Sequence, residues 1–317
     1  MKRRNFLKNT TALVACSAIP NYKAFAQSKA LNSIGIQLFS LPKLLENDFT
    51  AAIQMLAQMG YKEVELYGPF PYSATSAKEG WKMITPNLGF SGSGYFGHTP
   101  KEVKSILKEN GIQATSIHTD LDTLQTRMEQ LGEAGDEIGF NYIGLPAIPP
   151  EKRKTLDDYK MIAEAFNKIG EQAKEVGLKF AYHNHGYGLH EMDGHVPMNI
   201  ILDQTDPDLV FFEMDIFWTT AGGADPVSYL EAYPDRYHLM HLKDMKEKVQ
   251  FSGDGGDPGQ WIQLFPYMTT AGDGVLDIPS IISAGKKMGV THFYVEQDMV
   301  AQPEMALKRS IDYLKAI

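Results

Sequence analysis

Cysteine is almost missing from this chain. Cys16 is the only one among 317 residues. The sequence beyond it can therefore form no disulfide within the chain, no thiolate metal site and no cysteine nucleophile. Stability must come from a packed core, and a chain with 43% hydrophobic residues, including 16 Phe and 15 Tyr, can build a large one.

An excess of positive charge and long apolar runs are also missing. The formal net charge is −9, and without the five positive charges of the first 26 residues the remainder carries about −14 by charge counting. Nucleic acids and anionic lipid surfaces are therefore not expected partners. No later stretch approaches the roughly 20 apolar residues of a membrane span.

Residues 1–26 have the composition of an export signal. Basic residues without any acid precede a short apolar stretch, which ends at Ala24-Phe25-Ala26. The Arg3-Arg4 pair and the residues after it resemble the twin-arginine signal, which carries folded proteins across the bacterial inner membrane. This predicts a periplasmic protein. In the alternative, Leu13-Val14-Ala15-Cys16 is a lipoprotein box, and lipidated Cys16 would anchor the protein to a membrane.

Past Ser33, eight short apolar runs alternate with longer amphipathic runs. The predicted strands are 34–39, 64–67, 114–118, 142–145, 179–183, 210–215, 237–241 and 293–296. Such alternation predicts an α/β fold with a parallel sheet covered by helices, because parallel neighbours need crossover connections. Eight units predict a single (β/α)8 TIM barrel over residues 33–317. A doubly wound open sheet is disfavoured, because no glycine-rich loop follows the first strand.

The helical patterns cover 49–59, 101–110, 124–138, 156–176, 226–233, 278–288 and 303–316. Glycines that would end a helix follow five of them: Gly60, Gly111, Gly139, Gly177 and Gly289. Two long connections, 68–99 and 244–274, leave the C-terminal ends of strands two and seven. Because barrel enzymes keep their sites on that face, we expect these connections to cover a pocket rather than to be surface insertions.

Histidines and carboxylates gather at the ends of the last four predicted strands. Residues two apart in a strand face the same side. The pairs that share a direction are His183 and His185, Glu213 and Asp215, His241 and Lys243, and Glu296 and Asp298. Nitrogen and oxygen ligands without thiolate suit Mn²⁺, Zn²⁺, Co²⁺ or Mg²⁺. An acid such as Asp215 inside an apolar run is costly to bury unless it is paired or bound to a metal.

Five segments, in this order and at these intervals, resemble the sugar (phosphate) isomerase/epimerase superfamily of xylose-isomerase-like TIM barrels. They are Tyr182-His183-Asn184-His185, Glu213-Met214-Asp215-Ile216-Phe217-Trp218, His241-Leu242-Lys243-Asp244, Gly272-Asp273-Gly274 and Val295-Glu296-Gln297-Asp298. The resemblance spans the body after Ser33 and points to an exported subgroup with the Tyr-His-Asn-His motif. It implies a divalent metal ion at the barrel mouth with ligands His183, Asp215, His241 and Glu296.

One position departs from the family pattern. The strand-five ligand is usually a glutamate, where this chain has His183. In similar epimerases two metal-bound glutamates form the acid/base pair, so the departure disfavours two-base epimerisation and leaves one-base isomerisation or elimination. The close subgroup often has a glutamate a few residues later, where this chain has Gly188, and Glu191 is the candidate to compensate.

The expected chemistry is removal of a proton beside a carbonyl, which needs a Lewis acid and a base. Glu296 is the predicted base, and Glu65 is the second candidate, with a salt bridge at the barrel rim as its alternative role. Lys243 is predicted to steady an oxyanion or to pair with an acidic neighbour. His118 is predicted to donate to a sugar hydroxyl.

Three residues are predicted to bind substrate: His185, Trp218 and Tyr67. Aromatic rings pack on the C–H faces of sugars, although most aromatic residues belong to cores. Trp261, in the second long connection, is a further aromatic residue of this kind.

The sequence thus predicts a metal-dependent isomerase or epimerase that acts on a small saccharide or keto-sugar through an enediolate. No cluster of Arg and Lys forms a phosphate clamp, which favours an unphosphorylated substrate. The alternatives are a lyase that eliminates the aglycone from 3-keto-glycosides, a sugar-binding barrel without catalysis, and an endonuclease, which the acidic body disfavours. The composition fits a monomer or a homodimer.

Overall fold

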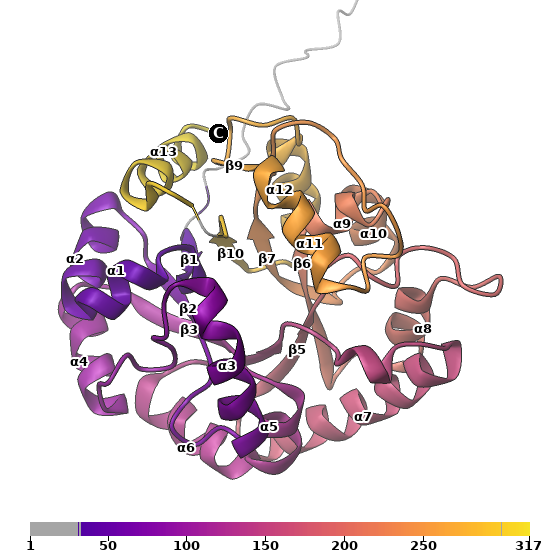
Figure 1. Cartoon of the computed structure of the whole chain (residues 1–317), viewed down its shortest axis with the longest axis horizontal. Coiled ribbons are helices and arrows are strands. Elements are labelled where there is room, and N and C mark those ends of the chain that lie inside the picture. The colour runs from indigo at the N-terminus through magenta and orange to yellow at the C-terminus, as the bar shows by residue number, and fades with distance from the viewer. Residues whose placement is uncertain (1–30, 32, 299) are drawn as a thin grey trace, which may run out of the picture.

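The computed structural model describes residues 31, 33–298 and 300–317. The predicted export signal and lipoprotein box lie outside these residues. Eight parallel strands close into a barrel, and helices surround it (Figure 1), so the predicted TIM barrel is confirmed. The order around the barrel is β1-β10-β7-β6-β5-β4-β3-β2. Each strand therefore pairs with its neighbours in the chain, apart from a separate short pair, β8 and β9.

The barrel strands lie close to the predicted ones. They are β1 (Gly35–Gln37), β2 (Glu63–Tyr67), β3 (Gln113–His118), β4 (Tyr142–Leu145), β5 (Lys179–His183), β6 (Val210–Asp215), β7 (Tyr237–Leu242) and β10 (His292–Val295). The antiparallel pair is β8 (Asp244–Met245) and β9 (Met268–Thr269). The glycines predicted to end helices all have a positive φ and follow a helix immediately or after one residue, as Gly60 does at 107° and Gly139 at 110°. This backbone conformation costs glycine little.

The α-helices are more numerous than predicted. They are α1 (Pro42–Asn47), α2 (Phe49–Met59), α3 (Thr75–Leu88), α4 (Pro100–Glu109), α5 (Leu121–Thr126), α6 (Met128–Ile138), α7 (Leu156–Glu175), α8 (Pro197–Gln204), α9 (Ile216–Ala221), α10 (Pro226–Ala232), α11 (Pro258–Leu264), α12 (Ile278–Lys287) and α13 (Pro303–Ala316). Short 3-10 turns are η1 (Leu38–Ser40), η2 (Pro150–Lys152) and η3 (Phe265–Tyr267). No helix among the described residues combines the length and the apolar character that a membrane crossing requires.

One helix prediction was wrong. The pattern over 124–138 is not one helix but two, because the backbone leaves the helical conformation at Arg127, with φ −133°. The first of the two, α5, starts earlier than predicted because Asp120 caps it by accepting a hydrogen bond from the Thr123 N–H.

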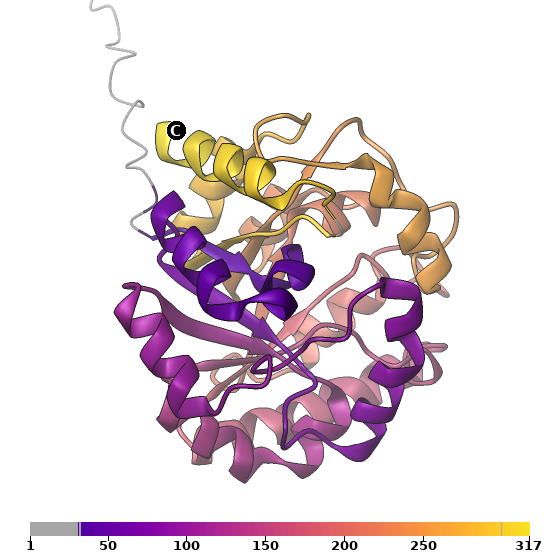
Figure 2. The same ribbon diagram turned by 60° about the vertical axis from the view of Figure 1, so that its left-hand side comes forward.

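The long connections contain structure of their own. Residues 68–99 include α3, and residues 244–274 include α11 and the β8–β9 pair. Figure 1 shows α3 and α11 nearer the centre of the view than the outer helices, and both helices contribute to the wall of the same pocket. The turned view of Figure 2 shows the strands running into the ring of helices. The expectation that these connections cover a pocket is therefore met.

The strand register brings the predicted site residues together. His183 pairs with Glu213 across β5 and β6, and Asp215 pairs with His241 across β6 and β7. Toward the N-terminal ends of the strands, the barrel is filled by a separate apolar group: Tyr142, Ala181, Leu239 and Tyr294. The polar residues of the predicted site thus lie in the C-terminal half of the barrel, where parallel-barrel enzymes keep their sites.

Candidate active site at the barrel mouth

A pocket of about 620 Å³ opens at the C-terminal ends of the strands. Strand ends supply Gln37, His118 and Glu296, whereas Trp81 of α3 and Trp261 of α11 stand on its walls. This volume lies within the range of small-molecule sites. The pocket is therefore large enough for a saccharide with a substituent.

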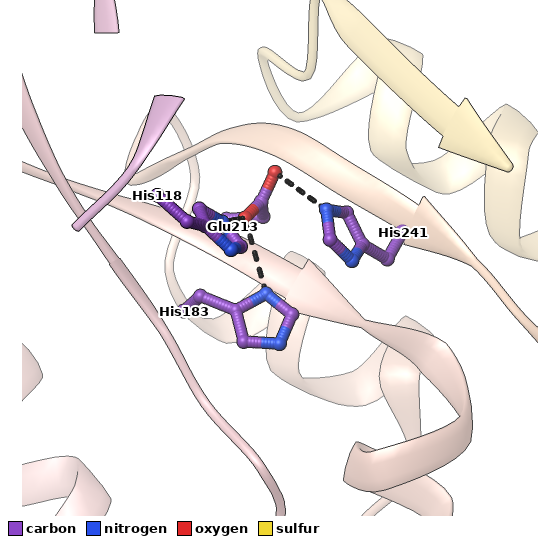
Figure 3. Close-up of side chains that lie close together, drawn as sticks. All are labelled: His118, His183, Glu213 and His241. Atoms are coloured by element: carbon purple, nitrogen blue, oxygen red, sulfur yellow. Dashed lines mark hydrogen bonds and ion pairs between the residues drawn. The ribbon is translucent and has the colours of Figure 1, made fainter. Parts of the chain in front are cut away.

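His118 of the pocket wall belongs to a group in which three imidazoles face one carboxylate (Figure 3). We name His118, His183, Glu213 and His241 the inner cluster; one ligand atom from each of them lies within 4.8 Å of the others. His118 Nε2 is 2.7 Å from Glu213 Oε2, and His183 Nδ1 is 3.1 Å from the same oxygen. His241 Nε2 is 3.1 Å from Glu213 Oε1. All four residues are buried.

Glu65 packs beside this cluster. Its Oε2 accepts a hydrogen bond from Gln37 Nε2 at 2.7 Å and lies 2.7 Å from His241 Nε2. The same oxygen is 3.2 Å from His118 Nε2. Glu65 has no exposed surface and is absent from the pocket wall. Of the two predicted bases, only Glu296 reaches the pocket.

A second group adjoins the first, and its Glu296 lines the pocket. We name Asp215, His241 and Glu296 the outer cluster; it shares His241 with the inner one. His241 Nδ1 is 2.9 Å from Glu296 Oε2. Asp215 holds the start of α9, because its Oδ1 accepts the Trp218 N–H at 2.9 Å. The structure thus brings three of the four predicted metal ligands together and places His183 in the inner cluster instead.

Lys243 contacts the outer cluster directly. Its Nζ lies 2.7 Å from Glu296 Oε2, 3.1 Å from Asp215 Oδ2 and 2.7 Å from Asp298 Oδ2. Burial alone would lower the pKa of Lys243, but Asp215, Asp298 and Glu296 raise it well above its usual value. The lysine is therefore charged, and of its two predicted roles the structure shows the pairing with acids.

The charges around Glu296 set the protonation of the pocket. Burial would raise the pKa of Glu296, but Lys243 and His241 hold it well below its usual range. Burial and the charge of Glu296 raise the pKa of Asp298 to about 7. Burial also lowers the pKa of His185 well below its usual value. Near neutral pH the pocket therefore holds an ionised Glu296, a neutral His185 and an Asp298 that is partly protonated.

The same reasoning applies to the inner cluster. Burial would lower the pKa of His241, but Glu213, Glu296 and Glu65 raise it well above its usual value. Burial would likewise lower the pKa of His118, which Glu65 and Glu213 raise. The cluster thus attracts positive charge.

All three predicted substrate-binding residues line the pocket: His185, Trp218 and Tyr67. The His185 ring stacks on Trp261 with centroids 4.9 Å apart. Tyr67 donates its hydroxyl hydrogen to the Gly92 carbonyl at 3.0 Å, so it offers the pocket its ring rather than its hydroxyl. The pocket therefore combines aromatic faces with a small number of polar groups.

Neither position considered for the missing strand-five glutamate supplies a ligand to the site. Glu191 is exposed and belongs to neither cluster. A Cβ at Gly188 would lie 3.0 Å from the Tyr159 hydroxyl oxygen. Neither residue completes the outer cluster.

The residues present fit a divalent ion. Imidazole nitrogens and carboxylate oxygens are the ligands that Zn²⁺, Mn²⁺ and Co²⁺ accept. Three buried carboxylate oxygens here accept no hydrogen bond: Glu65 Oε1, Glu213 Oε1 and Asp215 Oδ2. Two of them still lie 3.1 Å from a nitrogen, Glu213 Oε1 from His241 Nε2 and Asp215 Oδ2 from Lys243 Nζ, so Glu65 Oε1 is the least compensated. Buried acceptors of this kind are costly unless a cation compensates them.

Sequence reasoning gave no role to three residues of the site: Gln37, Glu213 and Asp298. The period-two pattern carried a signal for Glu213 and Asp298, because both share a direction with a predicted ligand. Gln37 had no such signal, since it ends a strand that carries no other polar residue. Its contact with Glu65 depends on the pairing of β1 with β2.

The family of the chain follows from comparison with known proteins. The family model described as xylose isomerase-like TIM barrel matches residues 53–317. The chain belongs to this family. Inosose dehydratase 2 of Bacillus cereus is 27% identical over 281 residues, which are 84% of this chain and 90% of that protein. Inosose dehydratase of Clostridium tetani is 27% identical over 212 residues, 66% of this chain and 68% of that protein.

Solved structures agree on the fold. A sugar phosphate isomerase/epimerase from Parabacteroides distasonis superposes with a TM-score of 0.69 at 25% identity, covering 94% of this chain and 98% of that one. The IOLI protein with a bound zinc atom superposes with a TM-score of 0.64 at 14% identity, covering 88% and 95%. The predicted superfamily is confirmed, and so is the prediction of an enzyme, of the isomerase or dehydratase type.

Proposed function

We propose that this protein removes the proton beside the carbonyl of an unphosphorylated keto-sugar and then expels a β leaving group, as a dehydratase or lyase does. The observation that carries this proposal is that Glu296 reaches the pocket while Glu65 is sealed beneath it. Removal and return of a proton on opposite faces needs two bases, whereas elimination needs one base and an acid for the leaving group. The relatives named inosose dehydratase support the same choice.

The pocket offers both groups. Glu296 is ionised and can accept the proton, and Asp298, with a pKa of about 7, can protonate the leaving group. Lys243 holds these two side chains at 2.7 Å each, so it fixes their relative position. A divalent ion held by imidazoles and carboxylates of this site would supply the Lewis acid that makes the C–H bond more acidic.

The walls of the pocket favour a neutral saccharide. Among the described residues that line it, none is Arg or Lys, and phosphate recognition normally uses such side chains. The aromatic rings of Tyr67, Trp218 and Trp261 suit the C–H faces of a sugar. A glycoside with a keto group at carbon 3 has its acidic proton on carbon 2 and its aglycone on carbon 1, which is β to the carbonyl. Loss of that proton with release of the aglycone as an alcohol is therefore the specific form of the reaction that we propose.

Isomerisation or epimerisation is the second candidate. It is supported by the similarity to the Parabacteroides distasonis sugar phosphate isomerase/epimerase at 25% identity. One-base isomerisation needs the same enediolate but returns the proton instead of expelling a group. The two candidates therefore share Glu296 and differ only in the fate of the intermediate.

The decisive experiment incubates metal-loaded protein in deuterated water with ketoses, aldoses and 3-keto-glycosides. NMR and mass spectrometry follow deuterium uptake and aglycone release. An unsaturated sugar with released aglycone supports the lyase, whereas a new isomer with deuterium beside the carbonyl supports the second candidate. If no substrate of the panel gives either product, both candidate reactions are wrong.

We also propose that the protein works in the periplasm. The proposal is supported by the Arg3-Arg4 pair, the apolar stretch after it and the Ala24-Phe25-Ala26 sequence. Twin-arginine export carries folded proteins, which suits an enzyme that acquires a metal ion before export. Lipidation at Cys16 would additionally hold it at a membrane.

A further inference from the structure

The two clusters of the site differ in the groups that offset the negative charge of their carboxylates. The outer carboxylates, Asp215 and Glu296, are in contact with an ammonium group, because Lys243 Nζ lies 3.1 Å and 2.7 Å from their oxygens. The ion pairs of the inner cluster involve only imidazoles and carboxylates. The inner cluster therefore contains no permanent cation of its own.

We propose that this chain binds its divalent ion in the inner cluster, through His118, His183, Glu213 and His241, and that Lys243 replaces a metal ion between the outer carboxylates. The inference rests on the proposed function only in taking the protein to bind a divalent ion. It differs from the ligand set that the family resemblance implies, which is Asp215, His241 and Glu296 with a strand-five residue.

Geometry favours the inner cluster. It supplies four ligands from four strands, β3, β5, β6 and β7, which is the number that a tetrahedral Zn²⁺ takes. The outer cluster supplies three, and neither Glu191 nor Gly188 gives a fourth. Figure 3 shows the imidazoles gathered around the Glu213 carboxylate, and one ligand atom from each of the four residues lies within 4.8 Å of the others. Ligands that already lie close together on rigid strand ends need little rearrangement to hold an ion.

Charge favours it as well. Four buried carboxylates lie within 4.0 Å of the His241 ring nitrogens: Glu65, Glu213, Asp215 and Glu296. Of these four, the buried Lys243 contacts only the outer two. Glu65 and Glu213 are left to imidazoles and to Gln37, and Glu65 Oε1 accepts no hydrogen bond. A divalent ion between Glu213 and the imidazoles compensates this charge, whereas an ion in the outer cluster would repel Lys243 at close range.

A matched pair of substitutions tests the proposal. Glu213 and Asp215 lie two residues apart on β6, both are buried, and each can be changed to its amide, as Glu213→Gln and Asp215→Asn. After loading with Zn²⁺ and removal of free metal, elemental analysis gives the zinc content, and circular dichroism verifies the fold. We expect Glu213→Gln to weaken zinc binding more than tenfold, since even indirect partners of a metal cost about that much, and Asp215→Asn to retain its zinc. The reverse order would overturn the proposal.

A second measurement decides the case in which the two variants behave alike or fail to fold. The zinc K-edge absorption spectrum of the unmodified protein counts imidazole ligands. The inner cluster supplies three and the outer cluster one. A spectrum with three imidazoles supports the proposal. A spectrum with two, as the set His183, Asp215, His241 and Glu296 would give, a spectrum with one, or a protein that binds no zinc overturns it. Neither measurement depends on turnover, so failure here is distinguishable from failure of the proposed reaction.

Discussion

At the scale of single residues, Glu296 has both the location and the ionised carboxylate that a general base needs. It lines the pocket, and Lys243 and His241 keep its carboxylate ionised in a buried place. The cost of burying its charge is offset by two short contacts, at 2.7 Å to Lys243 and 2.9 Å to His241. An amide in its place would keep the shape and lose the ability to take a proton.

We therefore expect Glu296→Gln to lower the rate of C–H proton exchange about 10²- to 10⁴-fold, which is the usual contribution of a positioned base. The measurement is deuterium uptake by the substrate, with circular dichroism to verify the fold. Glu191→Gln, at an exposed position outside both clusters, is the matched control and should exchange at the unmodified rate. Full exchange by Glu296→Gln would assign the base to another residue.

His238, which lies outside the site, makes the stability of the folded protein depend on pH. It is half-buried, stacks on Phe211 at 4.1 Å and contacts the Tyr142 hydroxyl at 2.9 Å. Burial and the nearby Lys179 lower its pKa from 6.5 to about 4. The unfolded chain therefore takes up this proton at a higher pH than the folded chain, and the stability present above pH 6.5 is lost as the pH falls toward 4.

We expect His238→Asn to reduce this loss between pH 6.5 and 4, the two pKa values of His238. The effect should be well below the roughly 3 kcal/mol of a full shift, because solvent screens a half-exposed group. Urea unfolding at several pH values measures it. His195→Asn, at an exposed position, is the control. Equal pH slopes for His238→Asn and the unmodified protein would contradict the prediction.

The sequence predicted the location of a side chain where its strand, and its direction from that strand, are enough to fix that location. Pairs two apart at the ends of β5, β6 and β7 had to face inward together. What the sequence could not show is which of these side chains contact one another, because that depends on the register of the strands. His183 pairs with Glu213, and Asp215 pairs with His241, so two clusters form where the sequence suggested one.

At the scale of elements, β4 can lie close to β3 because Gly144 has no side chain. Gly144 pairs with His118, and a Cβ at Gly144 would lie 2.6 Å from Cδ2 of the His118 ring. Contacts under 3.0 Å are essentially never tolerated, so the ring would have to move. His118 would then lose its 2.7 Å contact with Glu213.

Gly144→Ala should therefore destabilise the protein by about 1–3 kcal/mol, as overpacking does, and also weaken zinc binding. Thermal unfolding and zinc titration measure the two effects. Gly80→Ala in α3 is the control, because no atom lies within 4 Å of the added Cβ, and alanine favours a helix by up to about 1 kcal/mol. If both variants unfold at the same temperature, the close approach is not a constraint.

The helices show what sequence patterns can and cannot predict. Helices that bury one face, such as α2 and α13, begin and end where the pattern predicted them. The pocket helix α3 was missed because none of its residues is buried and Pro86 lies inside it. Short α9 was missed for another reason: a buried strand-end residue, Asp215, caps it. Short helices depend on tertiary contacts for their stability.

At the scale of the whole molecule, the export proposal concerns where the folded enzyme works. Changing Arg3→Lys and Arg4→Lys together keeps the charge but removes the twin-arginine pair. We expect the protein to remain in the cytoplasm, measured by cell fractionation and immunoblotting. Lys2→Arg, which keeps the pair, should still be exported. Periplasmic protein from the double variant would show that another route carries it.

Metal binding and folding are coupled through the barrel as a whole. The four ligands of the inner cluster come from β3, β5, β6 and β7, three of which are consecutive in the closed barrel. An ion there links strands that must separate when the protein unfolds, and the unfolded chain cannot hold all four ligands together. Its binding free energy therefore adds to the stability of the folded state.

Removal of the ion by a chelator should consequently lower the midpoint of thermal unfolding. An ion present at 100 times its dissociation constant stabilises a protein by about 2.7 kcal/mol, which corresponds to several degrees for a chain of this size. Differential scanning calorimetry measures the shift. Zinc should restore the midpoint, whereas calcium should not, because calcium requires six or more oxygen ligands and the inner cluster supplies three nitrogens and one carboxylate. An unchanged midpoint after chelation would separate metal binding from stability, and recovery with calcium would place the ion among the outer carboxylates instead.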